Sequence, residues 1–280
     1  SVAGKMAVGH ISPMLLTGMR WVVALVILVA IGHRQFRKDW PVVKANLPLM
    51  IVLGMIGFAF FNAAMYSGLL YTSAVNSSIE QAGIPLVTMA INFLLFRIRV
   101  SAAQIAGFML TLAGIAITAS HGDLRRLAEL DVNFGDFLIL GAVVMYGIYT
   151  VALRYKPDIH WQSTMIVFGA AALVASLPFM AWESATSRAI WPDMTGWLIV
   201  LYTVLGPSIL AQIFYMRGVE LIGPNRASLF INLLPIFGAV LSVIVLREQL
   251  HAYHASAFAL VLGGIALAEW SGRKMAAATR

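Results

Sequence analysis

Hydrophobic residues fill nine long stretches of the chain, and short polar segments separate them. The stretches lie near 12–32, 47–70, 74–96, 101–120, 134–155, 162–182, 195–218, 224–246 and 252–272. Each has about the 20 residues that an α-helix needs to cross the hydrocarbon core of a bilayer. Most are apolar on both faces, and no segment of about ten alternating residues indicates a strand of a β-barrel. The pattern predicts an all-α integral membrane protein with short connections, the two longest near 33–46 and 120–133.

Composition supports the membrane assignment. The chain is 60% hydrophobic and 11% charged, with a mean hydropathy of +0.86, whereas soluble domains are roughly half apolar and a quarter charged. The absence of cysteine excludes disulfides, thiolate metal sites and a cysteine nucleophile. The net charge of +7 is better explained by Lys and Arg in loops beside the membrane than by binding to nucleic acid.

One pattern occurs twice, at a constant offset of 150 residues. The first copy contains Gly68, Ser78, Pro85, Arg97, Phe108, Leu110, Leu112, Gly114, Ile115 and Ala116, and the second contains Gly218, Ser228, Pro235, Arg247, Phe258, Leu260, Leu262, Gly264, Ile265 and Ala266. Matched leucines mean little among apolar helices, but glycine, proline and arginine at one fixed offset indicate a duplication. We expect a first repeat at 1–120, a joining loop at 121–133, a second repeat at 134–272 and a tail at 273–280.

The two repeats contain unequal numbers of stretches. The second has five, whereas the first has four, preceded only by residues 1–10. We therefore expect that a first helix is largely missing from this sequence and that the intact protein has ten transmembrane helices. A repeat of five spans enters the membrane in the opposite direction from its copy, which predicts two inverted five-helix repeats.

Lys and Arg are unevenly divided between the two predicted sides of the membrane. Thirteen lie on one side, namely Arg34, Arg37, Lys38, Lys44, Arg97, Arg99, Arg154, Lys156, Arg217, Arg226, Arg273, Lys274 and Arg280. Five lie on the other, namely Lys5, Arg125, Arg126, Arg188 and Arg247. The positive-inside bias makes the first side cytoplasmic, which predicts a multi-pass protein of a bacterial inner membrane with its C-terminus in the cytoplasm.

Enzyme chemistry has little support in the sequence. All six histidines fall at or near predicted span ends: His10, His33, His121, His160, His251 and His254. No Asp lies deep in a span, and no G-x-S-x-G, P-loop or G-x-G-x-x-G motif occurs. We therefore expect no catalytic residues, no metal site and no cofactor.

Two charged residues lie inside predicted spans. Arg20 and Glu80 are eight and six residues into helices that run the same way, which places both roughly 9 to 12 Å below the external surface. Because an unpaired charge at that depth is costly, we expect them to meet directly or through a polar cavity. Such an ion pair could fix the helix register, or one member could sense a carboxylate, an ammonium group or a proton.

Other buried polar and aromatic residues form a candidate substrate-binding set. With Glu80, its members are Asn62, Tyr66, Gln81, Asn92, Tyr146, Tyr149, Ser208, Gln212, Tyr215 and Asn232. Asn62 and Gln212 are equivalent residues of the two repeats. Each side chain alone could serve only to hold helices together, whereas the whole set would suit a solvated cavity for an amphipathic organic solute.

Three prolines are candidate hinges. Pro85 and Pro235 interrupt equivalent helices, and Pro207 follows Gly206 at the position equivalent to Gly57. A proline inside a helix leaves one carbonyl without its donor, which allows either a fixed kink or a site for a ligand. Paired interruptions in inverted halves are typical of transport pathways.

Several segments together resemble one membrane protein family. They are ISPMLLTGMRW at 11–21, the Gly68 segment with Pro85, LRE at 246–248 and LGGI at 262–265. In order and spacing, and over essentially the whole chain, they resemble the EamA-type drug/metabolite transporter superfamily, most of all aromatic amino acid exporters of the YddG type. In one departure the first repeat has Arg97-Ile98-Arg99 where the second has Arg247-Glu248, so we assign no role to that acidic position.

The resemblance implies ten helices in two inverted repeats and a secondary transporter without a cofactor. Its partners would be the lipid bilayer and a small-molecule substrate, and the protein would act as a monomer. We expect export of small amphipathic metabolites, above all aromatic amino acids, by alternating access. A multidrug carrier, a nucleotide-sugar carrier and a non-transporting scaffold or receptor remain alternatives; a nucleotide-sugar carrier would need buried cations, and Arg20 is the one available.

Overall fold

The fold is helical throughout the described part of the chain. The computed structural model describes residues 9–98, 100–120, 122–123, 125, 133–186, 189–237 and 252–278. Within these residues, eight helices are long and apolar enough to cross a membrane. The ninth expected stretch, 224–246, is described only as far as residue 237. The all-α membrane fold is therefore confirmed.

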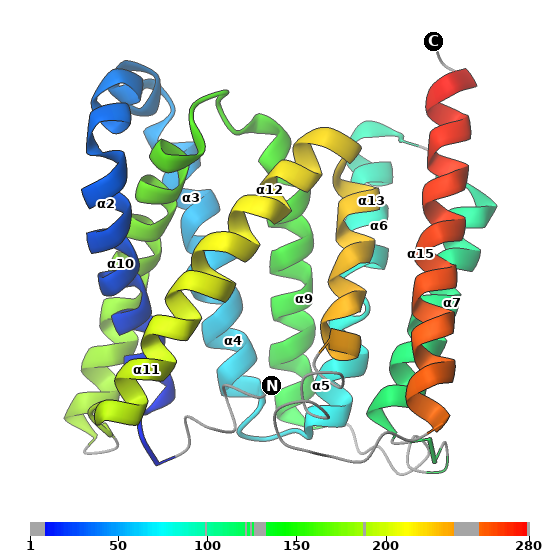
Figure 1. Cartoon of the computed structure of the whole chain (residues 1–280), viewed down its shortest axis with the longest axis horizontal. Coiled ribbons are helices and arrows are strands. Elements are labelled where there is room, and N and C mark those ends of the chain that lie inside the picture. The colour runs from blue at the N-terminus through cyan, green and yellow to red at the C-terminus, as the bar shows by residue number, and fades with distance from the viewer. Residues whose placement is uncertain are drawn as a thin grey trace. The chain divides into compact units, whose positions relative to one another are not determined.

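The helices follow one another with short connections (Figure 1). In chain order they are α2 (Pro13–Ala45), α3 (Leu47–Gly54), the π-helix η1 (Met55–Phe60), α4 (Phe61–Gly68), α5 (Ala74–Gln81), α6 (Ile84–Phe96), α7 (Ala102–Ala119), α9 (Phe134–Ala152), the 3₁₀ turn η2 (Leu153–Tyr155), α10 (Trp161–Ala185), α11 (Met194–Thr203), the π-helix η3 (Val204–Leu210), α12 (Ala211–Ile222), α13 (Pro224–Leu229), the 3₁₀ turn η4 (Phe230–Leu233) and α15 (Ala252–Ala278).

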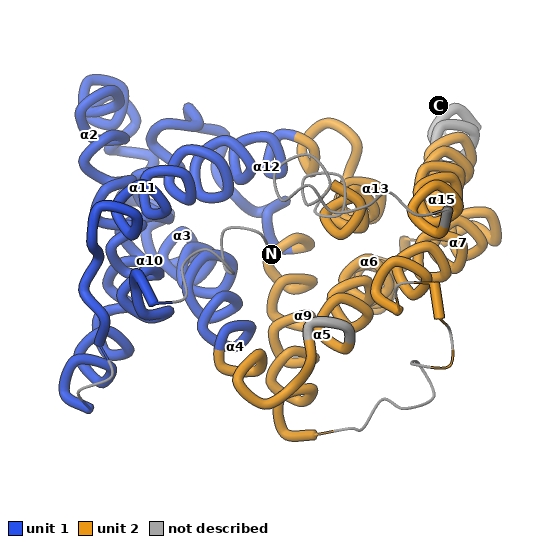
Figure 2. Tube along the Cα trace, turned by 60° about the horizontal axis from the view of Figure 1, so that its bottom comes forward, with its two compact units in different colours: residues 1–66, 152–217 blue, residues 67–151, 218–280 orange. Residues whose placement is uncertain are grey.

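The chain divides into two compact units, each built from both repeats (Figure 2). Unit 1 comprises residues 1–66 and 152–217, and unit 2 comprises residues 67–151 and 218–280. Unit 1 contains α2 and α3 with η1 from the first repeat, together with α10, α11 and η3 from the second. Unit 2 contains α5, α6 and α7 from the first repeat, together with α9, α13 and α15 from the second.

In unit 1, the equivalent helices α2 and α10 pack side by side in opposite directions (Figure 1). At one end the buried carboxylate of Glu183 on α10 accepts hydrogen bonds from the N–H of Leu15, at 2.8 Å, and from the hydroxyl of Ser12, at 2.6 Å. At the other end Asp39 on α2 accepts from the hydroxyl of Ser163 near the start of α10, at 2.6 Å. Each helix thus places a carboxylate at the positive N-terminal end of its partner, and the pair is joined at both ends.

In unit 2, the equivalent helices α7 and α15 form a second antiparallel pair (Figure 1). A Cβ atom on Gly107 would lie 2.4 Å from the carbonyl oxygen of Gly264, and one on Gly114 would lie 2.8 Å from that of Ala257. The offset of 150 residues converts Gly107 into Ala257 and Gly114 into Gly264, so these two contacts are equivalent. Small residues therefore bring the two backbones together about a local two-fold axis, as inverted repeats require.

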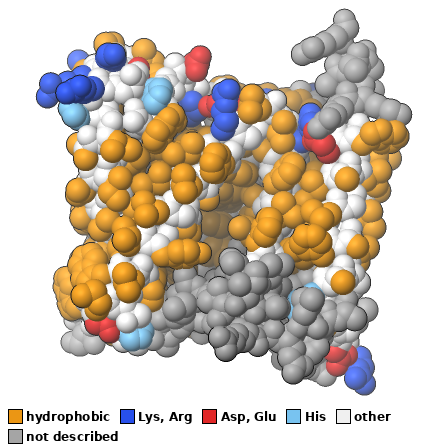
Figure 3. Space-filling model, viewed as in Figure 1, with side chains coloured by type: hydrophobic (Ala, Val, Ile, Leu, Met, Phe, Trp, Pro, Cys, Tyr) orange, Lys and Arg blue, Asp and Glu red, His pale blue; other side chains and the backbone are white. Residues whose placement is uncertain are grey.

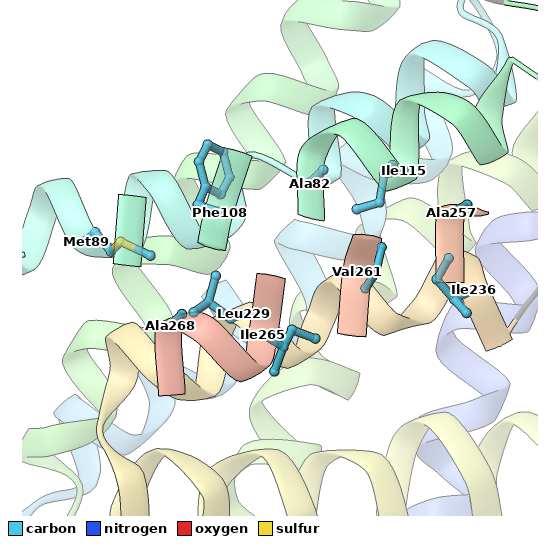
Figure 4. Close-up of a cluster of buried hydrophobic side chains, with 10 residues drawn as sticks. All are labelled: Ala82, Met89, Phe108, Ile115, Leu229, Ile236, Ala257, Val261, Ile265 and Ala268. Carbon is cyan, nitrogen blue, oxygen red and sulfur yellow. The ribbon is translucent and has the colours of Figure 1, made fainter. Parts of the chain in front are cut away.

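Buried hydrophobic side chains surround this second pair (Figure 4). The cluster contains Ala82, Met89, Phe108, Ile115, Leu229, Ile236, Ala257, Val261, Ile265 and Ala268. Ile115 and Ile265 are equivalent residues of the two repeats. This position therefore contributes to the core of unit 2 from both α7 and α15, whereas Phe108 is buried and its equivalent Phe258 is exposed.

The outward face of α2 is as apolar as its inward face. Trp21, Ala24 and Leu28 are buried, whereas Val22 and Val26 are exposed. Hydrophobic side chains cover the middle of the unit 1 helices, and Lys and Arg gather near one end of α2 (Figure 3). A helix that is hydrophobic all round while one face is exposed is suited to contact lipid.

One expected connection and the tail need comment. The loop expected at 33–46 is wrong, because α2 continues to Ala45 and only Asn46 separates it from α3. The length of an apolar stretch sets how much of a helix the membrane holds, and Arg, Gln and Lys continue a helix well beyond it. The tail expected from residue 273 likewise continues α15 to Ala278.

Parts of the sequence analysis lie outside the described residues. They are most of the joining loop 121–133, Lys5, Arg99, His121, Arg126, Arg188, the segment 246–248 with Arg247, His251 and Arg280.

The glycine contacts of α7 and α15 can be tested by adding one methyl group. Gly264→Ala should lower the stability of the protein by about 1–3 kcal/mol, because the new Cβ would meet the backbone of α7 at 2.4 Å. Gly263→Ala is the matched control, since a Cβ there has no atom within 4 Å and alanine favours the helix by about 0.5–1 kcal/mol. Thermal unfolding in detergent measures both. Equal effects of the two substitutions would contradict the close contact.

Candidate functional site

Unit 1 contains two π-helical turns at equivalent positions of the two repeats. In η1 the N–H of Phe61 bonds to the carbonyl of Ile56, and in η3 the N–H of Ala211 bonds to that of Gly206. Both bonds span five residues, and the offset of 150 relates them. Because only η3 contains a proline, Pro207, the π-turn belongs to this place in the repeat and does not require proline. Such turns often accompany functional sites.

Polar side chains donate hydrogen bonds to backbone carbonyl groups at both π-turns. The amide of Asn62 donates to the carbonyl of Phe58 at 2.9 Å. Pro207 has no N–H to offer the carbonyl of Thr203, and the hydroxyl of Ser208 donates to it instead, at 2.8 Å. Ser208 is buried, so its bond is the one expected of a packing residue.

A stack of aromatic rings joins α2, η1 and α10. The rings of Trp21 and Phe58 are parallel, with their centroids 5.0 Å apart and an interplanar angle of 4°. Phe58 in turn meets Phe168 edge to face at 5.5 Å. The three rings are almost fully buried. This stack fixes the orientation of the Trp21 ring, and with it the neighbouring part of α2.

Arg20 lies beside this stack. Its guanidinium carbon is 5.5 Å from the centroid of the Trp21 ring, within the range of a cation–π contact. It interacts electrostatically and by a hydrogen bond with the hydroxyl of Tyr66. The residue is only 6% exposed. Tyr66 and Arg20, predicted separately, are therefore brought together within unit 1.

Several buried polar atoms of unit 1 have no hydrogen-bond partner among the described residues. They are Nε and Nη2 of Arg20, Nε1 of Trp21, Oγ1 of Thr164 and Oε1 of Gln212. Buried polar groups in proteins are nearly always paired, so each exception needs an explanation. Unit 1 thus presents both donors and an acceptor that a solute could satisfy.

In unit 2, Glu80 has an acidic neighbour. Asp136, in the first turn of α9, is buried and accepts hydrogen bonds from the hydroxyl of Thr72 and from Asn76, the latter at 3.3 Å. Its charge acts on Glu80, whose Oε2 has no hydrogen-bond partner among the described residues. Glu80 thus has a second carboxylate as a neighbour within unit 2. No three His, Asp or Glu side chains in the described part of the chain are grouped to hold a metal.

The remaining candidate residues of unit 2 bond to its own helices. Asn92 donates to Asn225 at 2.6 Å and Asn232 donates to Thr111 at 2.9 Å. Gln81 donates to the carbonyl and hydroxyl oxygens of Ser77. The rings of Tyr146 and Tyr149 lie 5.4 Å apart and are buried. These contacts are the ones that a packing role gives, and a substrate role for these residues stays a prediction.

Pro85 lies beside an interruption of its predicted span and Pro207 lies within η3, and a hinge role for these prolines stays a prediction. Pro85 lies in the first turn of α6, after α5 has ended at Gln81. Proline is readily accepted there because the first N–H groups of a helix have no partner within it. Pro235 follows the 3₁₀ turn η4.

Two further expectations concern other residues. Tyr215 lies half-buried on α12. The expected ion pair of Arg20 with Glu80 would join residues of different units, and it stays a prediction.

Sequence reasoning missed three of the residues that shape these sites. Trp21, Asp136 and Glu183 each act across a helix–helix contact. Asp136 could have been identified from the sequence, because it is an acidic residue in the first turn of a predicted span, where it interacts favourably with the helix dipole. Trp21 and Glu183 carried none, because helix rotation decides which neighbours they meet.

The comparisons with known proteins agree with one another and point to one family of transporters. The model of the EamA-like transporter family matches residues 1–120 and 133–270. The uncharacterized transporter YetK of Bacillus subtilis is 25% identical over 266 residues, which cover 94% of this chain and 80% of YetK. YyaM of the same organism, also an uncharacterized transporter, is 26% identical over 247 residues, covering 86% and 79%.

A more distant relative agrees with this assignment, and a solved structure shares the fold. An uncharacterized transporter of Archaeoglobus fulgidus is 21% identical over 271 residues, covering 93% of this chain and 90% of its own length. One crystal structure is similar with a TM-score of 0.76 and 20% identity, and the match covers 98% of this chain and 92% of the other. At that identity the structural likeness shows the fold alone.

The aromatic stack makes a stability prediction. Trp21→Ala should reduce stability by about 3–5 kcal/mol, because it removes the ring that contacts Phe58 and leaves a cavity. Trp197→Ala on α11 is the control, since that side chain is 46% exposed. Thermal unfolding of the detergent-purified variants measures the difference. The stack would not be a structural support if both variants unfolded at the same temperature.

Proposed function

Because this membrane transporter belongs to the EamA-like family, we propose that it exports small amphipathic metabolites, above all aromatic amino acids, from a bacterial cytoplasm by alternating access. The observation that carries the proposal is the set of unsatisfied polar atoms in unit 1, with those of Arg20 beside the Trp21 stack. A zwitterionic solute offers an acceptor for the donors of Arg20 and a donor for Oε1 of Gln212. An aromatic side chain on that solute would suit the neighbouring rings.

The two repeats share a frame of backbone features, but the charged residues Arg20 and Glu80 of the first repeat have no charged equivalents in the second. Both have a π-turn followed by an amide, Asn62 in one and Gln212 in the other. The positions equivalent to Arg20, Tyr66 and Glu80 are instead Ala170, Met216 and Phe230. We infer that the symmetric frame serves the movement of the two halves, whereas the first repeat supplies the groups that recognise the solute.

The alternatives have less support. A nucleotide-sugar carrier would need several buried cations for its phosphates, and Arg20 is the one buried cation among the described residues of unit 1. A non-transporting scaffold would be expected to satisfy its buried polar groups, because each unsatisfied one costs about 1–3 kcal/mol. A multidrug carrier stays open as a broader version of the same function.

We also propose that the end of unit 1 carrying Arg34, Arg37 and Lys38 faces the cytoplasm. Arg154 lies in the connection before α10, toward the same end. The opposite end holds Glu183 and Asp193. Hydrogen bonds from the N–H of Gly196 and from His10 lower the pKa of Asp193, so this end stays negative at neutral pH. The difference follows the positive-inside bias.

Transport can be tested with purified protein in proteoliposomes. Uptake of radiolabelled aromatic amino acids should exceed that of empty vesicles, and Gln212→Ala or Asn62→Ala should reduce it about tenfold if each amide contributes one hydrogen bond to the solute. Leu221→Ala on α12 is the control, because that side chain is 66% exposed. Uptake no faster than in empty vesicles would refute the proposed function.

Orientation can be tested because the chain has no cysteine. A single cysteine at Thr186, exposed at the end of α10, should react with an impermeant maleimide added outside intact cells. One at Lys38, exposed at the other end of α2, should react only after the cells are permeabilised. The reverse pattern would show that the topology is the other way round.

A further inference from the structure

One particular edge of the Arg20 guanidinium group has no hydrogen-bond partner among the described residues. The two atoms without a partner, Nε and Nη2, lie on the same side of the planar group, and each points one N–H in nearly the same direction. This edge matches the two oxygens of a carboxylate. The residue is only 6% exposed, so bulk solvent reaches little of its charge.

The same edge of another arginine in this chain holds a carboxylate. Nε and Nη2 of Arg226 on α13 donate to the two carboxylate oxygens of Glu269 on α15. That pair belongs to unit 2 and is half-buried. The Arg226–Glu269 pair is therefore an example, within this protein, of the two-pronged interaction that we expect between Nε and Nη2 of Arg20 and a carboxylate.

The carboxylates in the described part of unit 1 are engaged elsewhere. Glu183 caps α2, and Asp39 bonds to Ser163 near the start of α10. Asp193 accepts from the N–H of Gly196 and bonds to His10. Asp158 is exposed in the connection before α10. No carboxylate of the described part of unit 1 thus serves as the counterion of Arg20.

We propose that Arg20 is the substrate-carboxylate receptor of this transporter, binding the two oxygens side-on through Nε and Nη2. The Trp21 ring, fixed by Phe58, holds one side of the guanidinium, and Tyr66 holds it by a hydrogen bond. Neither contact provides a hydrogen-bond partner for Nε or Nη2. The substrate class is therefore monocarboxylates, zwitterionic amino acids among them, in preference to their amides and amines. This inference rests on the proposed function and specifies it.

One buried guanidinium suits a single negative charge. A phosphate monoester carries a charge of about −1.5 to −2 at neutral pH and would need further cations. The other described cations of unit 1, such as Arg37, Lys38 and Arg154, are exposed at helix ends. A carboxylate is therefore the anion that this site fits.

The test compares matched ligands that differ only in the carboxylate. L-phenylalanine and L-phenylalaninamide, and 3-phenylpropionate and 3-phenylpropionamide, are offered to the whole chain. Binding is measured by thermal stabilisation in detergent, and transport by uptake into proteoliposomes. Wild type should bind each carboxylate about 10- to 100-fold more tightly than its amide, the range for a charge-assisted pair.

Substitutions at Arg20 test whether this residue causes the preference for a carboxylate over its amide. Arg20→Gln should abolish the preference for each carboxylate over its matched amide. Arg20→Lys keeps the charge but loses the two-pronged geometry, so it should retain a reduced preference, and it serves as the second variant if Arg20→Gln does not fold. Wild type without a preference, or an Arg20→Lys protein with the full preference, would overturn the proposal.

The competing role of Arg20 is an ion pair with Glu80. In that case Arg20→Gln would destabilise the protein, the additional change Glu80→Gln would restore its stability, and neither would alter the ratio of carboxylate to amide binding. That result would overturn the carboxylate receptor while leaving the transport function intact. If no ligand moves faster than into empty vesicles, the proposed function fails, and the binding ratio still decides the role of Arg20.

Discussion

Close antiparallel contact between equivalent helices is the constraint on which each unit depends. In lipid, apolar surfaces gain little by leaving the solvent, so helices must associate through fitted backbones and a few polar bonds. In unit 2 the fit is made at Gly107 and Gly264, where no side chain separates the chains. In unit 1 the bonds are made by Glu183 and Asp39, each at the start of the other helix.

Duplication explains why these contacts occur in related pairs. A contact between equivalent residues of inverted helices appears twice, so one small residue at the right position secures the helices at two points. The same symmetry places a π-turn in each repeat at η1 and η3. The charges depart from it, since Arg20 has Ala170 as its equivalent. A symmetric frame with asymmetric chemistry is suited to a transporter whose two halves move alike but whose solute binds in one orientation.

Much of the fold followed from the sequence because membrane helices are defined by length and hydropathy. The duplication and the helical class were readable from constant offsets and from the length of the apolar stretches. The end of α2 was not, because helix propensity continues where hydropathy stops. The electrostatic influence of Asp136 on Glu80 could not be predicted either, since it depends on how α5 and α9 are rotated. The candidate site was thus predicted as a set of residue types, while its contacts needed coordinates.

Disulfide cross-linking in native membranes tests the inverted pairing most directly, because the chain has no cysteine of its own. A Cβ on Gly32 would lie 3.1 Å from Cβ of Gln162, and one on Gly18 would meet the side chain of Met180. With a protease site inserted between the repeats, the account predicts that the cysteine pairs 32/162 and 18/180 hold the two fragments together after cleavage. Cross-linking of the exchanged pairs 32/180 and 18/162 instead would mean that α2 and α10 run parallel, and would contradict it.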